Sequence, residues 1–328
     1  MPSTTRTRAR VSVIIPAYNA AKTLQSCLDA LMLQTRIPDE IIVVDDGSVD
    51  ETKGVAESYS LVTVISQKNQ GPARARNVGA SRAKGTIIVF LDSDCVPEKN
   101  WLDEMIKPFT DEKVIGVQGA YRTKQTSLVA RFDQLDIEYR YERMKRATTL
   151  DWIGSYSAAY RKKIFIEEGG FDESFPKASG EDAELSYRMA KKGHRLIFAP
   201  QAVVFHTHPQ DLFHYLKVKY FRAYWRMRMY IKHPRKLIRD SYTPTSLKLS
   251  VTLAISSVLF ALGSLLLPVW EYWSLLCFIG FLFLYSLSYS PMRAGILLWT
   301  FGLVIYFFRS LAFAAGMSAG FLDRRVWS

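Results

Sequence analysis

Four short apolar runs in the first hundred residues constrain the fold most strongly. They are rich in Val and Ile, and they read VSVIIP (11–16), EIIVVDDGS (40–48), VTVIS (62–66) and TIIVFLDSD (86–94). The stretches between them place apolar residues at helical spacing, as residues 20–35 do. Strands that are apolar throughout are buried on both faces, and helices between them indicate parallel pairing. The sequence therefore predicts an α/β, Rossmann-like and mostly parallel sheet with helices on both faces.

Polar side chains follow three of these runs at the point where each predicted strand ends. They occupy residues 16–19, 45–48 and 92–94. Open parallel sheets bind ligands at the carboxyl ends of their strands, so we expect the three clusters to meet at one edge, as in a nucleotide site. Asp92 and Asp94 stand one residue apart, which is costly beside a buried strand unless a cation neutralises them.

The charge of the chain is uneven, and this favours a membrane as partner. The net charge is +12, which predicts an anionic partner, and much of the excess lies in residues 212–240. There Lys and Arg alternate with Phe, Tyr and Trp, a pattern typical of a helix at the headgroup layer of an anionic membrane. A solvated helix face is the plain alternative. We expect no nucleic-acid partner, because the segment that follows is apolar enough to insert.

Beyond residue 240 the chain is almost uncharged, which predicts an α-helical transmembrane region. Residues 246–270 and 272–290 are long and apolar enough to span a bilayer. Because the basic stretch precedes them, the positive-inside rule places residues 1–240 in the cytoplasm. Residues 295–322 form a third apolar stretch interrupted by Arg309, and the sequence leaves open whether it is a third span or an interfacial or re-entrant segment.

The predicted organisation has three parts. Residues 1–210 form the α/β domain, 211–243 basic interfacial helices and 244–328 the transmembrane region. The first residues lack the apolar stretch of a signal peptide, in keeping with a cytoplasmic first domain. Three cysteines without metal-type spacing favour a reducing compartment.

Several motifs together resemble the family 2 glycosyltransferases of GT-A fold. They are VSVIIPAYNAAKTLQSCLDALMLQ, IIVVDDGSVDET, GPARARNVGASRAKGTIIVFLDSDCVP and GGFDESF followed by GEDAELSYRMAKKGH, and they cover roughly residues 10–210. The resemblance rests on their shared order and spacing, since each motif alone is weak. It implies inverting transfer of a sugar from a nucleotide diphosphate with the help of Mn²⁺ or Mg²⁺.

The resemblance implies a metal site at the end of the fourth strand. Asp92-Ser93-Asp94 matches the DxD motif of the family, with Asp94 as the direct ligand and Asp92 acting through water or on the ribose. A divalent ion there stabilises the charge that develops on a diphosphate leaving group. His206 is the further predicted ligand, because of His206 and His208 at most one reaches the site from an extended strand. The plain alternative for the aspartates is a turn or helix cap.

Other residues are implied to bind the donor. Asp46 is expected to accept hydrogen bonds from the base, with Asp45 beside it. Arg76 is expected to reach a phosphate or to hold an aspartate in place, and a solvated surface arginine is the alternative. The predicted rim beside the base consists of Pro16, Ala17, Tyr18 and Asn19.

The acceptor side is implied by GEDAELSYRM. Asp182 matches the catalytic base that removes the proton from the attacking hydroxyl, and Glu181 is expected to position acceptor or sugar. Acidic residues also suit a helix N-terminus, which is the structural alternative. The sugar pocket is expected to include Trp152, Gly154 and Ser155.

The predicted function is transfer of a single sugar, from a UDP-sugar or alternatively a GDP- or dTDP-sugar, to a hydroxyl of a membrane or lipid-linked glycan acceptor. The reaction is expected at the cytoplasmic face of a bacterial or archaeal membrane, in glycan or polysaccharide biosynthesis. A processive polysaccharide synthase is one alternative, although no QxxRW motif is present. Polyprenyl-phosphate sugar synthesis, a nucleotidyltransferase lacking its GxGxR loop, and a non-catalytic membrane scaffold are the others.

Overall fold

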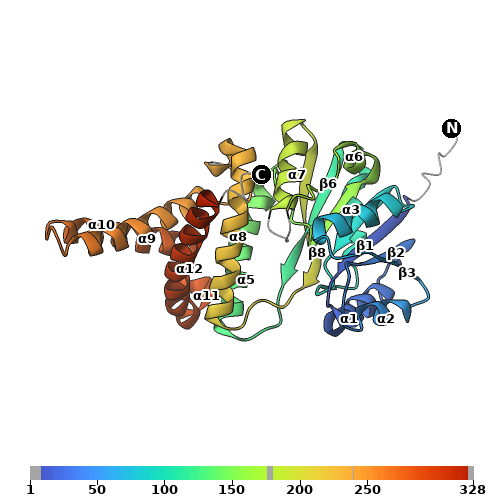
Figure 1. The fold of residues 1–328 in the computed structure, drawn as a ribbon, viewed down its shortest axis with the longest axis horizontal. Coiled ribbons are helices and arrows are strands. Elements are labelled where there is room, and N and C mark those ends of the chain that lie inside the picture. The colour runs from blue at the N-terminus through green and yellow to red at the C-terminus, as the bar shows by residue number, and fades with distance from the viewer. Residues whose placement is uncertain (1–8, 176–179, 239, 324–328) are drawn as a thin grey trace. The chain divides into compact units, whose positions relative to one another are not determined.

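The computed structural model describes residues 9–175, 180–238 and 240–323, which form two compact units (Figure 1). We call Met1–Arg122 with Thr148–His206 the sheet unit, and Thr123–Ala147 with Thr207–Ser328 the helical unit. The helical unit thus takes in residues 123–147, which interrupt the sheet unit in sequence. The domain boundaries expected after residues 210 and 243 stay predictions, because compact units need not coincide with domains.

The sheet unit is built on one eight-stranded sheet, with the order β3-β2-β1-β4-β7-β6-β8-β5. Strands β3, β2, β1 and β4 are parallel to one another, β7 is antiparallel to both of its neighbours, and β6 pairs with β8 in parallel. The predicted, mostly parallel α/β sheet is confirmed. The strands are β1 Val11–Ala17, β2 Glu40–Asp45, β3 Val62–Ser66, β4 Ile87–Leu91, β5 Val96–Pro97, β6 Val114–Arg122, β7 Ser157–Arg161 and β8 Arg195–Phe205.

Helices cover both faces of this sheet, and β1 shows why. Val13 and Ile15 share a core cluster with the buried face of α1. On the opposite face, a Cβ at Gly79 of α3 would lie 2.4 Å from Ile14 Cγ2, so glycine lets α3 approach the strand closely. Because neighbouring strand residues point to opposite faces, α1 and α3 lie on opposite sides. The helices of this unit are α1 Ala21–Met32, α2 Thr52–Glu57, α3 Pro72–Arg82, α4 Trp101–Ile106, α6 Lys162–Glu167 and α7 Glu181–Lys191.

The helical unit has its own core, which includes Phe132, Tyr215, Phe281, Tyr285 and Ile305. Three of its helices are long and apolar enough to cross a membrane, namely α9, α10 and α12. The first two coincide with the two predicted spans. The helices are α5 Leu128–Arg146, α8 Leu212–Lys232, α9 Thr245–Gly263, α10 Trp270–Ser288, α11 Pro291–Ala294 and α12 Ile296–Leu322.

Candidate active site

The loops that follow β1 and β2 lie against each other at the carboxyl edge of the sheet. Asp46 N donates to Ala17 O at 2.8 Å, and Asn19 N donates to Ser48 Oγ at 2.9 Å. Asn19 adopts a positive φ of 49°, which Asn tolerates better than most residues, and its side-chain oxygen accepts from Val49 N. Two of the three predicted polar clusters are therefore joined through their backbones.

Asp45 and Asp46 differ in what their carboxylates already bind. Asp46 is buried and accepts hydrogen bonds from Gln67 Nε2, Gln70 N and Gly71 N at 2.6 to 2.9 Å. It thereby ties the end of β2 to the loop that leads into α3. Asp45 accepts from Ser48 N at 3.1 Å. Asp46 thus has fewer lone pairs left for a ligand, so the expected contact with a base fits Asp45 at least as well.

The rest of the predicted rim is divided between burial and exposure. Ala17 is buried as the last residue of β1, and Pro16 pairs with Val44 in the register between β1 and β2. The Tyr18 side chain is 52% exposed. An aromatic ring on this edge can stack on a flat ligand without first leaving the core.

A buried arginine connects the DxD segment to α7. Arg76 is 2% exposed, and its two terminal nitrogens lie 2.7 Å from Asp92 Oδ1 and 3.0 Å from Glu181 Oε1. Burial opposes the guanidinium charge, but the two carboxylates outweigh it and raise the pKa of Arg76 above its ordinary value. Glu181 also accepts from Gly180 N at 3.0 Å. Arg76 therefore holds two motifs that are far apart in sequence.

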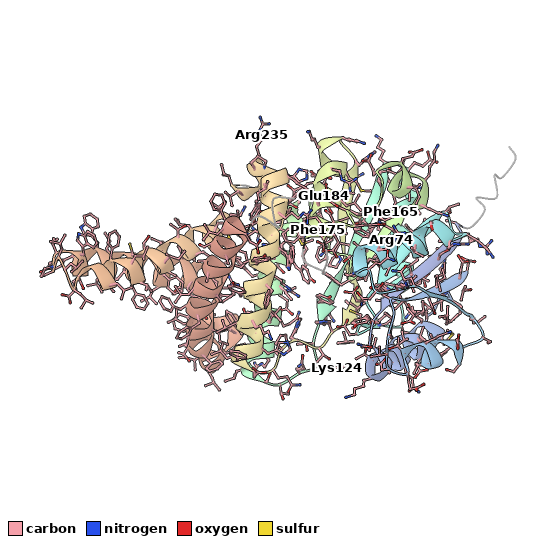
Figure 2. All side chains as sticks on the ribbon, viewed as in Figure 1. Arg74, Lys124, Phe165, Phe175, Glu184 and Arg235 are labelled. Carbon is pink, nitrogen blue, oxygen red and sulfur yellow. The ribbon has the colours of Figure 1, made fainter. Side chains whose placement is uncertain are left out.

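Arg74, on the same helix as Arg76, has a different environment. It pairs with Glu173 at 2.7 Å, and both side chains are more than one-third exposed. Figure 2 labels Arg74 on α3 together with Glu184 on α7, whose carboxylate binds Arg188 at 2.8 Å. The solvated surface arginine that was weighed for this helix is thus found at Arg74.

The structure brings Asp94 together with His206. Asp94 Oδ2 lies 3.3 Å from His206 Nε2, and the Asp94 side chain is 46% exposed. Burial of the carboxylate opposes its charge, but the hydrogen bond and charge of His206 lower the pKa of Asp94. His206 follows β8, whose end pairs with β5 directly after the DxD segment. His208 belongs to the helical unit instead, where its ring contacts Gln134 Oε1 at 3.0 Å.

These side chains fit a divalent ion in part. Carboxylate oxygens suit Mg²⁺ and Mn²⁺, and Asp94 is accessible to a ligand. Asp92, in contrast, turns Oδ1 toward Arg76. Within residues 9–175, 180–238 and 240–323, no three His, Cys, Asp or Glu side chains converge closely enough to hold a metal ion. Asp94 and His206 thus offer two donors, and a metal bound to them needs its remaining ligands from the donor and water.

Two tyrosines that sequence reasoning missed stand behind His206. The rings of Tyr121 and Tyr156 stack with centroids 3.5 Å apart, and the Tyr121 ring lies 4.7 Å from that of His206. Tyr156 is fixed in turn, because Gln118 Nε2 donates to its hydroxyl and the hydroxyl donates to Gly119 O. The sequence carries no signal for this stack, since it depends on β6 and β8 being neighbours.

Asp182 lies at the start of α7 and faces the segment before β7. Its Oδ2 accepts from Ser155 N at 3.3 Å and its Oδ1 from Ala183 N at 2.7 Å. Burial, with a contribution from the negative charge of Glu181, raises the pKa of Asp182 to about 6. The carboxylate is thus an effective proton acceptor near neutral pH.

The predicted pocket residues lie beside this carboxylate. A Cβ at Gly154 would be 3.8 Å from Asp182 Oδ2 and would clash with the Tyr156 ring at 2.7 Å, so only glycine lets the chain pass here. Gly154 N donates to Gln118 Oε1 at 2.9 Å. Trp152 is 8% exposed and contributes mainly to packing.

The comparisons with known proteins agree with this geometry. The sequence model described as glycosyl transferase family 2 matches residues 12–169. Glycosyltransferase AglE of Haloferax volcanii is 31% identical over 232 residues, a match that covers 67% of this chain and 73% of the relative. The chain therefore belongs to glycosyl transferase family 2, as its motifs predicted.

Other relatives and structures share parts of this picture. Pre-mycofactocin glycosyltransferase of Mycobacterium tuberculosis is 28% identical over 268 residues, which is 79% of this chain but 56% of that protein. Mannosyltransferase PcManGT of Pyrobaculum calidifontis, solved with GDP-Man and Mn²⁺, has a TM-score of 0.61 at 24% identity and covers 97% of this chain and 88% of its own. GalNAc-T7, solved with UDP, GalNAc and Mn²⁺, has a TM-score of 0.51 at 20% identity, covering 74% of this chain and 54% of its own. At these identities the likeness concerns the fold, which is GT-A-like.

Proposed function

We propose that this protein is a metal-dependent, inverting glycosyltransferase that moves one sugar from a nucleotide diphosphate sugar to a hydroxyl of a membrane or lipid-linked acceptor. The observation that carries the proposal is the bridge from Asp92 through Arg76 to Glu181. It fixes the DxD segment next to the residue that precedes Asp182. A group suited to a diphosphate and a group suited to accepting a proton are thereby held in one rigid arrangement.

The donor side of the proposal rests on the joined loops after β1 and β2. Asp45 retains free acceptor capacity for a base, and the exposed ring of Tyr18 offers a stacking surface. Asp46 supports the loop that carries α3, and through it Arg76. We expect a UDP-sugar as donor. GDP- and dTDP-sugars are the alternatives.

Asp94 and His206 would hold a divalent ion, Mn²⁺ or Mg²⁺. When bound, such an ion neutralises the charge that develops on the diphosphate as the glycosidic bond breaks. The side chains contribute an anionic oxygen and an imidazole nitrogen from two different strand ends. The role of Asp92 in the proposal is to anchor Arg76 and to orient the segment that carries Asp94.

Asp182 accepts the proton of the attacking hydroxyl. As that oxygen forms its bond to the anomeric carbon, the bond from this carbon to the diphosphate oxygen breaks on the opposite face. The leaving diphosphate keeps the electron pair, the proton passes to Asp182, and the configuration at the anomeric carbon inverts. The hydrogen bonds from Ser155 N and Ala183 N orient the carboxylate for this transfer.

The acceptor is assigned to the cytoplasmic face of the membrane on the strength of two features. Helices α9 and α10 are apolar enough to anchor the chain in a bilayer, and α8 is rich in basic residues. A lipid-linked glycan reaches an enzyme anchored in this way by lateral diffusion. An anionic lipid diphosphate would also be attracted by the basic side chains.

The proposal is tested with the purified full chain in detergent and a panel of UDP-, GDP- and dTDP-sugars. The acceptors are a lipid-diphosphate-linked oligosaccharide and a polyprenyl phosphate, each with Mn²⁺ or with EDTA. We expect metal-dependent extension of the oligosaccharide, abolished by Asp182→Asn. Transfer to polyprenyl phosphate that survives Asp182→Asn would instead support a phosphate nucleophile, which is already ionised. Failure of every donor and acceptor, with and without metal, would favour the non-catalytic scaffold.

A further inference from the structure

The last apolar helix, α12, has different surroundings from the other two. It has 27 residues and a mean hydropathy of 1.8, so by length and composition it could cross a membrane. Yet 33% of its most apolar window is buried within the protein, compared with 22% for α9 and 17% for α10. The neighbours that bury α12 show whether lipid can surround it.

The C-terminal half of α12 packs along the basic helix α8. A Cβ at Gly316 would lie 2.2 Å from Tyr220 O, and one at Gly320 would lie 2.4 Å from Tyr224 O. The two backbones are therefore in contact over more than one turn. Just after α12 ends, Asp323 accepts a hydrogen bond from Tyr224 Oη at 2.5 Å.

Helix α8 is unsuited to the interior of a bilayer. Its 21 residues include six cations, which are Lys217, Lys219, Arg222, Arg226, Arg228 and Lys232. Charged side chains are costly at the centre of a membrane. A helix that runs beside α8 backbone to backbone lies at the same depth. The second half of α12 therefore lies where α8 lies, at the membrane surface.

The middle of α12 is tied to the charged helix α5. Arg309 Nη1 lies 2.8 Å from Asp136 Oδ1, and the side chains are 6% and 1% exposed. Asp136 also binds Arg140 at 2.7 Å. One turn and more toward the N-terminus, Gly302 faces the Phe132 ring of α5. The counter-ion of Arg309 thus comes from an amphipathic helix and not from a second spanning helix.

Helices α9 and α10, in contrast, form a hairpin that extends away from α8 and α12 (Figure 1). Both ends of the hairpin are held: Lys248 pairs with Asp240 at 2.9 Å, and Tyr289 Oη donates to Asp136 at 2.5 Å. Toward the turn its surface is apolar and open, with Leu265 and Leu266 more than 80% exposed. Each helix has 19 residues, or about 28 Å, which matches the thickness of the hydrocarbon layer.

We propose that α5, α8 and α12 form a platform that rests on the membrane surface, and that among the described helices only the α9–α10 hairpin crosses the bilayer. The outer face of α8 presents Phe213 (79% exposed), Lys217 and Phe221 (44% exposed) at intervals of four residues. Aromatic rings with adjacent cations fit the headgroup layer of an anionic bilayer. The end of α12 then lies on the same side of the membrane as the sheet unit. This inference does not depend on the proposed reaction.

Labelling of cysteines from the two sides of the membrane tests the proposal. In the full chain with Cys277→Ser, the remaining Cys27 and Cys95 are buried and unreactive. Three reporters are compared: Lys107→Cys in the sheet unit, Val269→Cys in the hairpin turn, and a cysteine on a flexible polar tail added after Ser328. The Lys107 side chain is 75% exposed and Val269 is 57% exposed. Each is treated with a membrane-impermeant maleimide in right-side-out and in inverted vesicles.

We expect the tail and Lys107→Cys to react from the same side and Val269→Cys from the other. A tail that reacts together with Val269→Cys would mean that α12 crosses the membrane and would overturn the proposal. Reaction of Val269→Cys from the side of Lys107→Cys would overturn it as well, because the hairpin would not span.

A measurement of depth gives an independent test. An environment-sensitive fluorophore on Ser318→Cys of α12 or on Leu262→Cys of α9 is quenched by lipids that carry the quencher at defined depths. The full chain is held in nanodiscs of phosphatidylcholine and phosphatidylglycerol. We expect Leu262→Cys to report the hydrocarbon layer and Ser318→Cys the headgroup layer or water. Equal, deep quenching at both positions would overturn the proposal.

Discussion

The guanidinium of Arg76 lies 3.0 Å from the carboxylate of Glu181, and both side chains are almost completely removed from water. The same guanidinium binds Asp92, so one cation compensates two carboxylates from opposite sides of the site. A buried charge that loses its partner is strongly destabilising, by about 3–5 kcal/mol. The bridge should therefore matter for folding and for activity together.

Replacing Arg76 with Met should lower the free energy of unfolding by about 3–5 kcal/mol and abolish transfer, since Asp92 and Glu181 would repel each other in the core. Arg76→Lys should fold better but remain much less active, because one ammonium cannot bind both carboxylates in the fork geometry of arginine. Thermal unfolding and donor turnover are measured together. The matched control is Arg74→Met on the same helix, whose exposed pair with Glu173 should contribute less than about 1 kcal/mol. Equal losses for both variants would contradict the special role of Arg76.

Asp182 should give the reaction a characteristic dependence on pH. Its pKa is raised to about 6, so it is protonated below that pH and cannot accept a proton. We expect kcat to fall about tenfold per pH unit below pH 6 and to level off above it. Asp182→Asn should reduce kcat by about 10²- to 10⁴-fold at neutral pH.

The same shift predicts an opposite effect of Asp182 on stability. A carboxyl whose folded pKa exceeds its unfolded pKa binds protons more tightly in the native state, so its ionisation destabilises the fold as pH rises between about 4 and 6. Asp182→Asn should therefore have a higher melting temperature than the native chain at pH 7.5, and the difference should shrink below pH 4. A less stable Asp182→Asn variant would argue against the desolvated carboxylate.

Asp94 and His206 should control metal-dependent binding of the donor nucleotide. With Mn²⁺ present, UDP or another nucleoside diphosphate should raise the melting temperature, and Asp94→Ala should abolish this increase. His206→Ala should reduce it. Asp111→Ala is the control, because this exposed carboxylate pairs with Arg195 on the surface of the same unit. A nucleotide shift that persists in Asp94→Ala with Mn²⁺, but disappears in Asp92→Ala, would assign the metal to the wrong carboxylate here.

Much of the sheet unit could be predicted because its signals are local. The runs at 11–16 and 86–94 are apolar at every position, so they had to be buried strands whatever their partners. The polar residues that end such strands could also be assigned to one edge, since parallel strands share their direction. The pairing of β8 with β5, which brings His206 to Asp94, has no local signature and was expected from the family resemblance alone.

The helical unit was harder to predict for an electrostatic reason. Read by itself, the segment of α5 is a polar helix that could equally face water. Its Asp133 and Asp136 are instead buried, because Lys219 of α8 and Arg309 of α12 supply counter-ions from far along the chain. Ion pairs between distant residues leave no periodic pattern in a sequence. For the same reason, the sequence could not decide the position of α12.

The stacked tyrosines should affect the metal site through His206. Replacing Tyr121 with Leu removes the ring that lies against His206, so the imidazole loses its fixed orientation toward Asp94. Groups that orient a metal ligand typically contribute 10- to 100-fold in metal affinity. We expect the Mn²⁺ concentration for half-maximal activity to rise about tenfold, with a smaller change in kcat at saturating Mn²⁺. Tyr121→Phe, which keeps the ring, should restore near-native Mn²⁺ dependence. A loss of kcat without a change in Mn²⁺ dependence would mean that Tyr121 acts elsewhere.

Asp136 should be the most sensitive position of the helical unit. It receives Arg140, Arg309 and the hydroxyl of Tyr289, and although burial opposes its charge, the two cations hold its pKa well below the ordinary value. Asp136→Asn leaves both arginines without a counter-ion, and we expect a loss of about 3–5 kcal/mol. The loss is measured as the fraction of full chain that stays monodisperse in detergent after heating. Glu142→Gln on the same helix is the control, because its exposed pair with Lys145 should contribute about 0.3–0.5 kcal/mol. If Asp136→Asn survived heating as well as this control, then the pair with Arg309 would not be what holds α12 to α5.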